Sequence, residues 1–396
     1  MIQLVKRYYS KYIRPVFRCF LYTDRRDDPP GCTKSQLDQG RKFPLLCSNY
    51  WFVHFNGEAE EPRSYAKDSM RQIVLQAPGE FIEREVPEPS PEPGHALLQM
   101  RRVGVCGSDF HAYRGTHPAY TYPRILGHEL AGEVLQAHAD QDCVKQGDRC
   151  AIEPYWACGH CPACLKGRTN CCDNIRVFGI HIDGGLQGVL SVPVHLLHKS
   201  ALLDFDQLAL VETLGIGAHA VQRSGLEKGE TALVIGAGPI GLAVMQFAQA
   251  AGAEVVVVEK NKRRREFAAS FGVEAIAGAE DRMANVVFDA TGSAAAMSAS
   301  LEHVSSTGRL VFAGLTKERV CLDDPLLHRR EITVFASRNS RAQFPRIIKM
   351  IEKSEIDISR WINECMSLAE VPGRFKGLIG NSSLIKAMIE IEAVDL

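Results

Sequence analysis

Short apolar runs broken by proline and glycine characterise the chain from residue 70 to about residue 194. The runs FIEREV and GEVLQAH are typical, because alternating apolar and polar side chains lie on the two faces of a half-buried strand. This pattern predicts strands rather than helices. Their short, regular spacing favours an all-β, partly open barrel.

Longer apolar runs with a helical segment between them follow in residues 213–335. ALVIGAGPIGLAVMQFAQAAGAEVVVVE predicts a strand, a helix and a second strand, and VVFDATGS and GRLVFAGL predict two later strands. Near-continuous apolar runs are typical of parallel strands that are covered on both faces. Between Val258 and Val286 the chain is about a dozen residues shorter than a full strand–helix–strand series requires. We therefore predict an α/β protein with a doubly wound parallel sheet, but not the details of one peripheral helix.

A glycine motif, Gly236-x-Gly238-x-x-Gly241, joins the first of these strands to its helix. Gly236 permits a tight turn, Gly238 lets a pyrophosphate approach the backbone, and Gly241 lets the helix pack against the strand. The helix N-terminus, which begins with Pro239 and Ile240, then faces the phosphates. These five residues predict a dinucleotide-binding loop.

Glu259 ends the second strand, where a carboxylate can accept hydrogen bonds from the adenine ribose hydroxyls. It would repel a 2′-phosphate, so Glu259 favours NAD over NADP. A basic cluster that could tolerate the phosphate follows, but we favour its interpretation as a solvated helix start. Its members are Lys260, Lys262, Arg263, Arg264 and Arg265.

Several side chains that can bind metal ions fall close together in residues 103–134: Cys106, Asp109, His111, His128 and Glu129. Cysteine and histidine are the usual zinc ligands, and nearby glycines suit the tight bends that bring ligands together. Either Cys106 or His128 alone would be interpreted as a buried core residue. Their joint occurrence predicts a metal site completed by Glu129 or a more distant carboxylate.

A second group of cysteines has the spacing C-x₂-C-x₂-C, at Cys158, Cys161 and Cys164, with Cys172 eight residues after Cys164 and Cys171 directly before it. Four thiolates around one ion make a closed tetrahedral site, which is typical of structural zinc. The alternative, a cluster of unliganded thiols, is disfavoured because exposed free thiols oxidise.

Composition excludes several classes of protein. The 396 residues suffice for two or three domains, and 45% hydrophobic and 23% charged residues are typical of a globular enzyme. The net charge of −1 predicts no binding to nucleic acid or to anionic membranes. Apolar runs stay below the roughly 18 residues that span a bilayer. Clustered cysteines in a long chain without a secretory signal favour a reducing compartment, the cytoplasm.

Residues 1–69 differ from the remainder of the chain. The first part is basic and aromatic, and the second is rich in turn formers. An organelle transit peptide, a flexible amphipathic arm, and a segment upstream of a native start at Met70 are the three interpretations. We favour the third, and we predict that residues 1–69 are poorly ordered and carry no function.

The motifs G-x-C-G-[ST]-D-x-H and G-H-E-x-x-G, at Cys106 and His128, resemble those of the zinc-dependent medium-chain alcohol and polyol dehydrogenases. The resemblance covers residues 70–396. It implies a GroES-like catalytic domain over residues 70–212, completed by residues 336–396, and a Rossmann domain over residues 213–335. It also selects Cys172 rather than Cys171 as the fourth ligand of the structural zinc.

Within that resemblance, Cys106 and His128 bind the catalytic zinc together with a carboxylate. Glu129 is one candidate. Glu212 is the other, since VETLGIGAHAV is similar to the E-P-L-x₄-H-A stretch of sorbitol dehydrogenase-like members. The resemblance further implies that Asp109 orients His128, and that Ser108 and His111 form the start of a proton relay.

The pattern SRN…FP near the end is similar to a subgroup that acts on sugar acids and polyols, including L-galactonate and L-gulonate 5-dehydrogenases. Arg338 and Arg341 could bind a substrate carboxylate bidentately or could anchor a loop or the cofactor. Tyr113, Arg114 and Tyr155 are candidate pocket residues.

The resemblance thus predicts an oxidoreductase that transfers hydride from a secondary alcohol of a sugar acid or polyol to NAD, with two zinc ions per chain. L-threonine or another small alcohol is the alternative substrate. A zinc- and nucleotide-binding protein without turnover is the non-enzymatic alternative. Family members are usually homodimers or homotetramers, and we expect the same here.

Overall fold

The computed structural model describes residues 69–137 and 143–392. The N-terminal segment interpreted as an extension falls outside these ranges except for Ser69, so its interpretation stays a prediction. The described residues belong to one compact unit of the chain and contain two large β-sheets. In this part of the chain, no helix combines the length and apolarity needed to cross a bilayer.

A seven-stranded sheet contains half of the strands that lie in the region predicted to be all-β. Its order is β16–β17–β3–β4–β5–β9, and β8 also pairs with β3. The strands are β3 (His95–Val105), β4 (Glu129–Ala137), β5 (Arg149–Ile152), β8 (Val189–Pro193), β9 (Leu197–Lys199), β16 (Ile362–Ser367) and β17 (Lys386–Glu390). A hairpin of β1 (Ser69–Ala77) and β2 (Glu80–Pro87) adds to this region, as does a two-stranded pair of β6 (Tyr155–Trp156) and β7 (Arg176–Val177). The predicted all-β region is confirmed.

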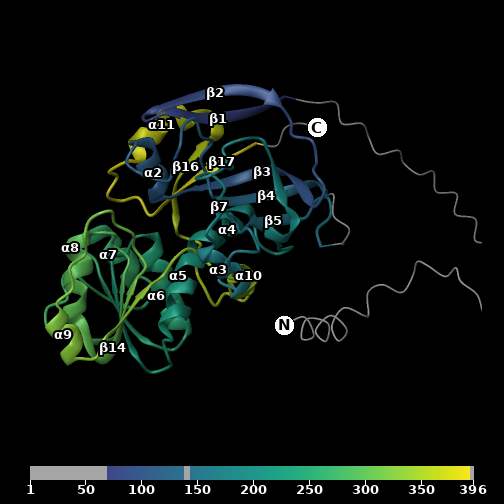
Figure 1. Cartoon of the computed structure of the whole chain (residues 1–396). Coiled ribbons are helices and arrows are strands. Elements are labelled where there is room, and N and C mark those ends of the chain that lie inside the picture. Colours follow the sequence, from purple (N-terminus) through teal and green to yellow (C-terminus); the bar gives the residue numbers. More distant parts are fainter. Residues whose placement is uncertain (1–68, 138–142, 393–396) are drawn as a thin grey trace, which may run out of the picture. The chain divides into compact units, whose positions relative to one another are not determined.

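The end of the chain completes this sheet. β17 pairs antiparallel with β3, with Met388 opposite Gly104, and β16 pairs parallel with β17. Figure 1 shows the yellow strands β16 and β17 beside the blue strand β3. The return of the chain to the first sheet agrees with the expected architecture, while the domain limits of 212 and 335 stay predictions.

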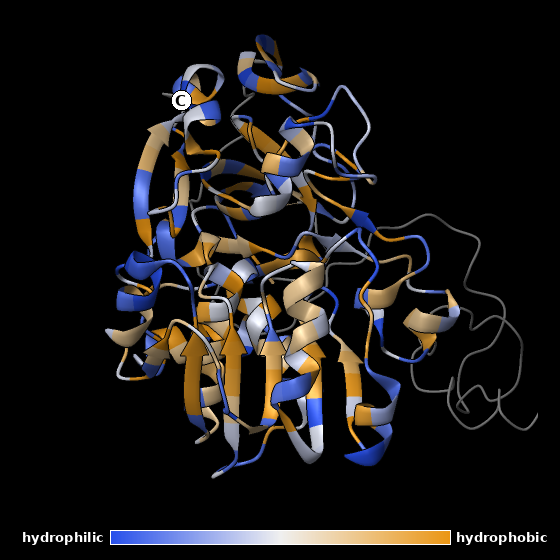
Figure 2. Cartoon of the chain, turned by 90° about the vertical axis from the view of Figure 1, so that its left-hand side faces the viewer, coloured by the Kyte–Doolittle hydropathy of each residue, from blue (hydrophilic) through white to orange (hydrophobic). Residues whose placement is uncertain are grey.

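The second sheet has six parallel strands in the order β12–β11–β10–β13–β14–β15. The strands are β10 (Thr231–Ile235), β11 (Glu254–Val258), β12 (Glu274–Ile276), β13 (Ala284–Asp289), β14 (Val304–Phe312) and β15 (Thr333–Ala336). They are predominantly hydrophobic in Figure 2, as expected for strands with helices on both faces. The predicted doubly wound sheet is confirmed.

The shortened interval before β13 has a simple cause. It contains α7 (Lys262–Ala269) and β12, but only the short connection 277–283, without a helix, joins β12 to β13. The later strands are separated by α8 (Ala294–Ala299) and α9 (Asp324–Arg329). The missing helix is therefore a peripheral one, and it leaves the loop after β10 untouched.

One apolar core runs from β4 and β5 through α4 (Phe205–Ala209) and α5 (Val211–Ser224) to α6 (Pro239–Ala250) and α10 (Phe344–Glu352). The backbones of α5 and α6 approach closely, since a Cβ on Gly217 would lie 2.5 Å from the Cβ of Ala243. Dense packing of this kind restricts movement of either helix. The first turn of α5, which carries Glu212, is thereby held beside the antiparallel sheet.

Candidate functional site

The loop before α2 (Gly107–Tyr113) presents Cys106. Its backbone N–H donates a hydrogen bond of 2.8 Å to Oδ2 of Asp109, which lies in the first turn of the helix. An acidic side chain in this position is favourable because it satisfies a free N–H at the helix start. The short motif C-G-S-D thus fixes both the thiol of Cys106 and the buried carboxylate of Asp109.

His128 precedes β4 and faces this loop. Its Nδ1 lies 3.7 Å from Oδ1 of Asp109, and its Nε2 lies 3.4 Å from Oγ of Ser108. The ligand atoms of Cys106, His128 and Glu129 all lie within 4.8 Å of one another. The structure therefore brings together three of the predicted ligands and the residue predicted to orient His128.

The residues present fit a zinc ion. A thiol, an imidazole and a carboxylate form a suitable donor set, and Nδ1 of His128 and Oδ1 of Asp109 are buried without a hydrogen-bond partner. Space for the carboxylate depends on Gly104, because a Cβ there would lie 2.1 Å from Oε2 of Glu129. The arrangement is what a buried metal centre with an orienting carboxylate requires.

Lys386 is a residue of this site that the sequence analysis missed. Its Nζ lies 2.6 Å from Oε1 and 2.7 Å from Oε2 of Glu129, and it also donates to Oγ1 of Thr213 at 3.2 Å. Burial alone would lower the pKa of Lys386, but Glu129 reverses the shift, so that the pKa is raised overall. A single lysine in the apolar strand IKAMIE was the available signal, because a buried lysine requires a partner.

Glu212 lies close to this group without joining it. It is buried, it accepts a hydrogen bond from the hydroxyl of Tyr155, and burial raises its pKa to about 7. Its charge acts on the pKa of His128, which shows that the two are neighbours. Tyr155, a candidate pocket residue, thus holds the second candidate carboxylate, and its role in the pocket stays a prediction.

The two residues of the predicted proton relay occupy different surroundings. Ser108 is beside His128, whereas His111 is exposed and its Nδ1 lies 3.1 Å from Oγ1 of Thr116. Among the described residues, no hydrogen bond joins Ser108 to His111. The relay therefore stays a prediction.

Tyr113 belongs to an aromatic cluster. Its ring centroid lies 5.6 Å from that of Phe81 and 5.4 Å from that of Phe375. Packing accounts for these contacts, while Arg114, at the end of α2, is exposed. A substrate role for either residue stays a prediction.

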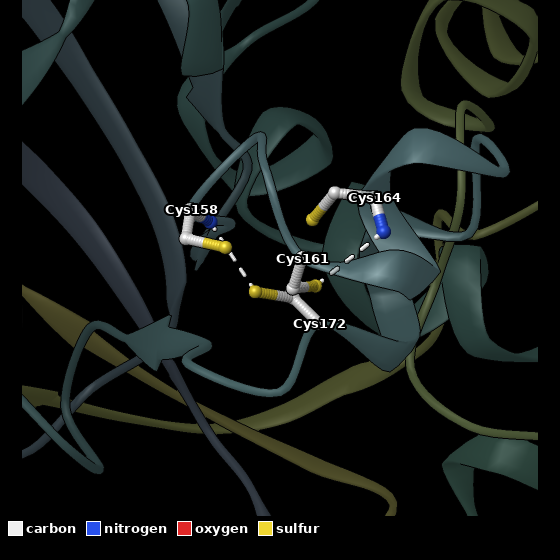
Figure 3. A group of neighbouring side chains, drawn as sticks. All are labelled: Cys158, Cys161, Cys164 and Cys172. Atoms are coloured by element: carbon white, nitrogen blue, oxygen red, sulfur yellow. Dashed lines mark hydrogen bonds between the residues drawn. The ribbon is translucent and has the colours of Figure 1, made fainter. Parts of the chain in front are cut away.

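The four cysteines of the second cluster converge around α3 (Pro162–Leu165). Their sulfur atoms lie within 4.8 Å of one another, and Figure 3 shows them turned toward a common centre. Cys158 donates its backbone N–H to Sγ of Cys172 at 3.2 Å, and Cys164 donates to Sγ of Cys161 at 3.5 Å. Backbone N–H groups lower the pKa of Cys158 to about 6, which favours a thiolate. Cys171 is exposed and is not a member of the group.

The predicted cofactor loop follows β10. Gly236 has a φ of 96°, and a Cβ on Gly241 would lie 1.8 Å from the carbonyl oxygen of Gly236, so both positions favour glycine. Gly238 is the N-cap of α6, and Pro239 occupies the first turn. Free N–H groups at this helix start can bind phosphate.

Glu259 follows β11 at the edge of this loop. Its Oε2 accepts the N–H of Ala237 and its Oε1 accepts the N–H of Asn261, both at 2.8 Å. Two members of the basic cluster have structural partners, since Arg264 donates to the carbonyl of Leu384 and Arg265 to that of Glu259. Lys260, Lys262 and Arg263 are exposed, as expected for a solvated helix start.

Arg338 and Arg341 both contact the cysteine loop. Nε of Arg338 donates to the carbonyl of Asn170 at 3.3 Å, and Nη1 of Arg341 donates to that of Gly167 at 3.1 Å. Asn170 in turn donates to the carbonyl of Arg338 at 2.8 Å. The loop-anchoring contacts of the two predicted alternatives are present, and a role in binding a carboxylate stays a prediction.

Two models of known protein families match the segments of the chain that contain most of the two sheets. Residues 92–202 match the alcohol dehydrogenase GroES-like domain, and residues 239–353 match the zinc-binding dehydrogenase domain. The chain is 36% identical to L-galactonate-5-dehydrogenase of Escherichia coli K12, over 81% of this chain and 99% of that protein. It is 29% identical to sorbitol dehydrogenase of Bacillus subtilis, over 76% of this chain and 91% of that protein.

Solved structures of related dehydrogenases superpose on this chain. A zinc-binding dehydrogenase of Sinorhizobium meliloti bound to NADP superposes with a TM-score of 0.75 at 29% identity, covering 82% of this chain and 99% of that one. An alcohol dehydrogenase of Escherichia coli CFT073 complexed with NADH superposes with a TM-score of 0.77 at 25% identity, covering 81% and 99%.

Proposed function

The chain belongs to the zinc-dependent medium-chain alcohol and polyol dehydrogenases, and we propose that it oxidises a secondary alcohol of a sugar acid or polyol with NAD as hydride acceptor. The observation that carries the proposal is the convergence of Cys106, His128 and Glu129, whose ligand atoms lie within 4.8 Å of one another beside Ser108. As a member of this family the protein is an oxidoreductase.

Cys106 and His128 are the proposed ligands of the catalytic zinc, with Glu129 as the carboxylate. Glu129 is favoured over Glu212 because it belongs to the converging group, whereas Glu212 is held by Tyr155. A zinc ion there would supply Lewis-acid charge for the substrate oxygen, and a bound nicotinamide would accept the hydride. Cys158, Cys161, Cys164 and Cys172 are the proposed ligands of the structural zinc.

The remaining residues of the site orient groups and move a proton. Asp109 faces Nδ1 of His128 at 3.7 Å, and its charge favours the ring orientation in which Nε2 is available as a ligand. The hydroxyl of Ser108 lies beside that nitrogen and is placed to take the proton of the substrate alcohol. His111, exposed at the far end of α2, would pass it to solvent. Lys386 balances the charge of Glu129 in the buried site.

Glu259 supports NAD over NADP. Its carboxylate lies at the loop that would bind the pyrophosphate, where a ribose 2′-phosphate would meet a negative charge. One related structure contains NADP and another contains NADH, so the fold alone does not decide between the two cofactors. A dimer or tetramer and a cytoplasmic location remain part of the proposal.

The test is NADH formation with L-galactonate, L-gulonate, sorbitol and L-threonine, each with and without a zinc chelator. Oxidation of an aldonate or polyol that the chelator abolishes and zinc restores is the expected result. Oxidation of L-threonine alone would favour the small-alcohol alternative. A protein that binds zinc and nucleotide but oxidises none of these substrates would support the non-enzymatic alternative.

A further inference from the structure

A short segment that leads into β17 contacts the cores of both sheets. We call residues 382–385 the connecting segment. Leu384 is packed in the apolar cluster that contains Phe375 of α11 (Val371–Leu378), whereas the next residue, Ile385, is packed in the cluster that contains Phe247 of α6. Both leucine and isoleucine are buried. The connecting segment is therefore held by apolar packing on two sides.

On the side of the antiparallel sheet, Asn363 of β16 fixes the connecting segment. Its Oδ1 accepts the N–H groups of Ile385 at 3.0 Å and of Lys386 at 3.2 Å. Its Nδ2 donates to the carbonyl of Ser383 at 2.8 Å. One amide thus uses both its acceptor and a donor on the backbone immediately before the buried ammonium of Lys386. The position of Lys386 depends on the conformation of this segment.

On the side of the parallel sheet, two polar side chains contact the same backbone. Nδ2 of Asn261 donates to the carbonyl of Ser382, and Nη2 of Arg264 donates to that of Leu384, both at 3.1 Å. Oδ1 of Asn261 accepts the N–H of Arg264, so Asn261 is also the N-cap of α7. The start of α7 is therefore bonded to the connecting segment at two points.

Glu259 joins these contacts to the proposed cofactor loop. One of its carboxylate oxygens accepts the N–H of Ala237, between the first two glycines of the loop, and the other accepts the N–H of Asn261. A ligand that occupies the loop and binds this carboxylate restricts Asn261 through one hydrogen bond. Asn261 in turn restricts Ser382 through another.

The other end of the connecting segment leads directly to the candidate metal centre. Lys386 follows Ile385, and its Nζ contacts both oxygens of Glu129. Glu259 and Glu129 are thus connected by hydrogen bonds at each end and by a few residues of backbone between them. A displacement of the connecting segment would move the counter-ion of a proposed zinc ligand.

We propose that Asn261 and Arg264 are positioning residues, which couple occupancy of the dinucleotide site to the placement of Lys386 and Glu129 in the metal centre. This inference rests on the proposed function, because it requires a cofactor at Glu259. A bound cofactor holds the connecting segment against the parallel sheet and thereby fixes the ammonium of Lys386. Coupling between two binding sites is reciprocal, so a complete metal centre favours cofactor binding by the same factor.

The experiment measures hydrogen exchange of the full, zinc-loaded chain with and without saturating ADP-ribose, which carries the pyrophosphate but lacks the nicotinamide. In the wild type, ADP-ribose should slow exchange in residues 236–241 and, by about fivefold or more, in β17. Asn261→Ser keeps a capping hydroxyl but is too short to reach Ser382, and Arg264→Met removes the second donor. Each variant should keep the protection of residues 236–241 and lose that of β17. Arg264→Lys, which retains a donor, should recover part of it.

Arg329→Met is the matched control, because Arg329 is exposed on α9 of the same sheet, and it should behave as the wild type. With the substrate that the wild type oxidises in the assay above, Asn261→Ser should lower kcat at saturating NAD about fivefold. Persistence of the β17 protection in both variants, its absence from the wild type, or an unchanged kcat would overturn the inference and leave the proposed function intact. Absence of protection at residues 236–241 in the wild type would overturn the proposed cofactor site itself.

Discussion

Lys386 and Glu129 form a buried ion pair in which one ammonium nitrogen lies 2.6 Å and 2.7 Å from the two oxygens of the carboxylate. Lys386 also donates to Thr213 and lies 3.4 Å from the carbonyl of Val105. Removing one partner of a buried pair leaves an uncompensated charge, which is far more costly than losing both. The pair therefore has two effects: it stabilises the sheet, and it balances the charge of the proposed zinc ligand Glu129.

Replacing Lys386 by methionine should destabilise the protein by about 3–5 kcal/mol, because Glu129 would remain buried without its counter-ion. Urea unfolding of zinc-loaded and chelator-treated protein would measure the change. The double variant Lys386→Met, Glu129→Gln should recover part of the loss. Lys349→Met, an exposed lysine of α10, is the control. A loss below about 1 kcal/mol for Lys386→Met would show that the pair does not stabilise the fold.

Replacing Cys164 by serine should remove one zinc ion per chain and lower the melting temperature, because a closed site with four thiolates contributes directly to folding. Metal analysis and thermal unfolding would test this. Cys171→Ser is a closely matched control, since Cys171 adjoins the cluster but is exposed outside it. Retention of both zinc ions by Cys164→Ser, or loss of one by Cys171→Ser, would contradict the proposed ligand set.

Acidification should destabilise the protein through His219. This residue is buried on α5, its Nε2 lies 3.2 Å from Nδ2 of Asn170, and burial with the nearby Arg341 and Arg168 lowers its pKa to about 4. In the unfolded chain its pKa is about 6.5. Between these values the unfolded state binds the additional proton, so stability decreases as the pH falls through this window.

Urea midpoints measured from neutral pH to about pH 4 should therefore fall more steeply for the wild type than for His219→Gln, which cannot titrate there. His303→Gln provides a control with a partly exposed imidazole. Identical slopes for the wild type and His219→Gln would show that the buried imidazole does not set the acid sensitivity.

Replacing Glu259 by serine should shift the cofactor preference. The carboxylate that would repel a 2′-phosphate is removed, and the exposed Lys260, Lys262 and Arg263 are available to attract it. We expect the ratio of kcat/KM for NADP to that for NAD to rise about tenfold or more, an effect of roughly 1.4 kcal/mol. Glu254→Ser, at the other end of β11, serves as the control. An unchanged ratio would remove Glu259 from cofactor selection.

A chain that begins at Met70 should keep full activity and melting temperature if residues 1–69 carry no function. Met70 itself must remain, because it is buried and its sulfur lies 3.3 Å from the backbone N of Val189. A second truncation beginning at Leu75, which removes most of β1, should unfold or aggregate. A large loss of activity or stability in the first truncation would show that the preceding residues belong to the fold.

The sequence predicted best those features whose residues are close together along the chain. The thiols from Cys158 to Cys172 and the glycines from Gly236 to Gly241 have their geometry fixed by local spacing, so a motif is sufficient to place them. The parallel sheet was also predictable, because its strands are short, near-continuous apolar runs rich in β-branched residues.

Contacts between distant segments were not predictable in the same way. Nothing in the local sequence of Lys386 indicates Glu129, and nothing around Tyr155 indicates Glu212, since these contacts depend on how separate elements pack. For the same reason the sequence left the choice between two carboxylates open. Tyr113 was predicted as a pocket residue, and its aromatic contacts with Phe81 and Phe375 were likewise not predictable from its neighbours in the sequence.

The position of β17 has a consequence for biosynthesis. During translation the N-terminal part of a chain leaves the ribosome first and usually begins to fold there. β3 cannot acquire its partner β17, and Glu129 cannot acquire its counter-ion, until residues 386–390 have been synthesised and released from the exit tunnel. The parallel sheet, whose strands all lie between residues 231 and 336, has no such delay. The sheet that carries the metal centre therefore starts to be synthesised first but completes its folding last. A ribosome that stalls near the end of the message would present an assembled parallel sheet beside an incomplete metal centre.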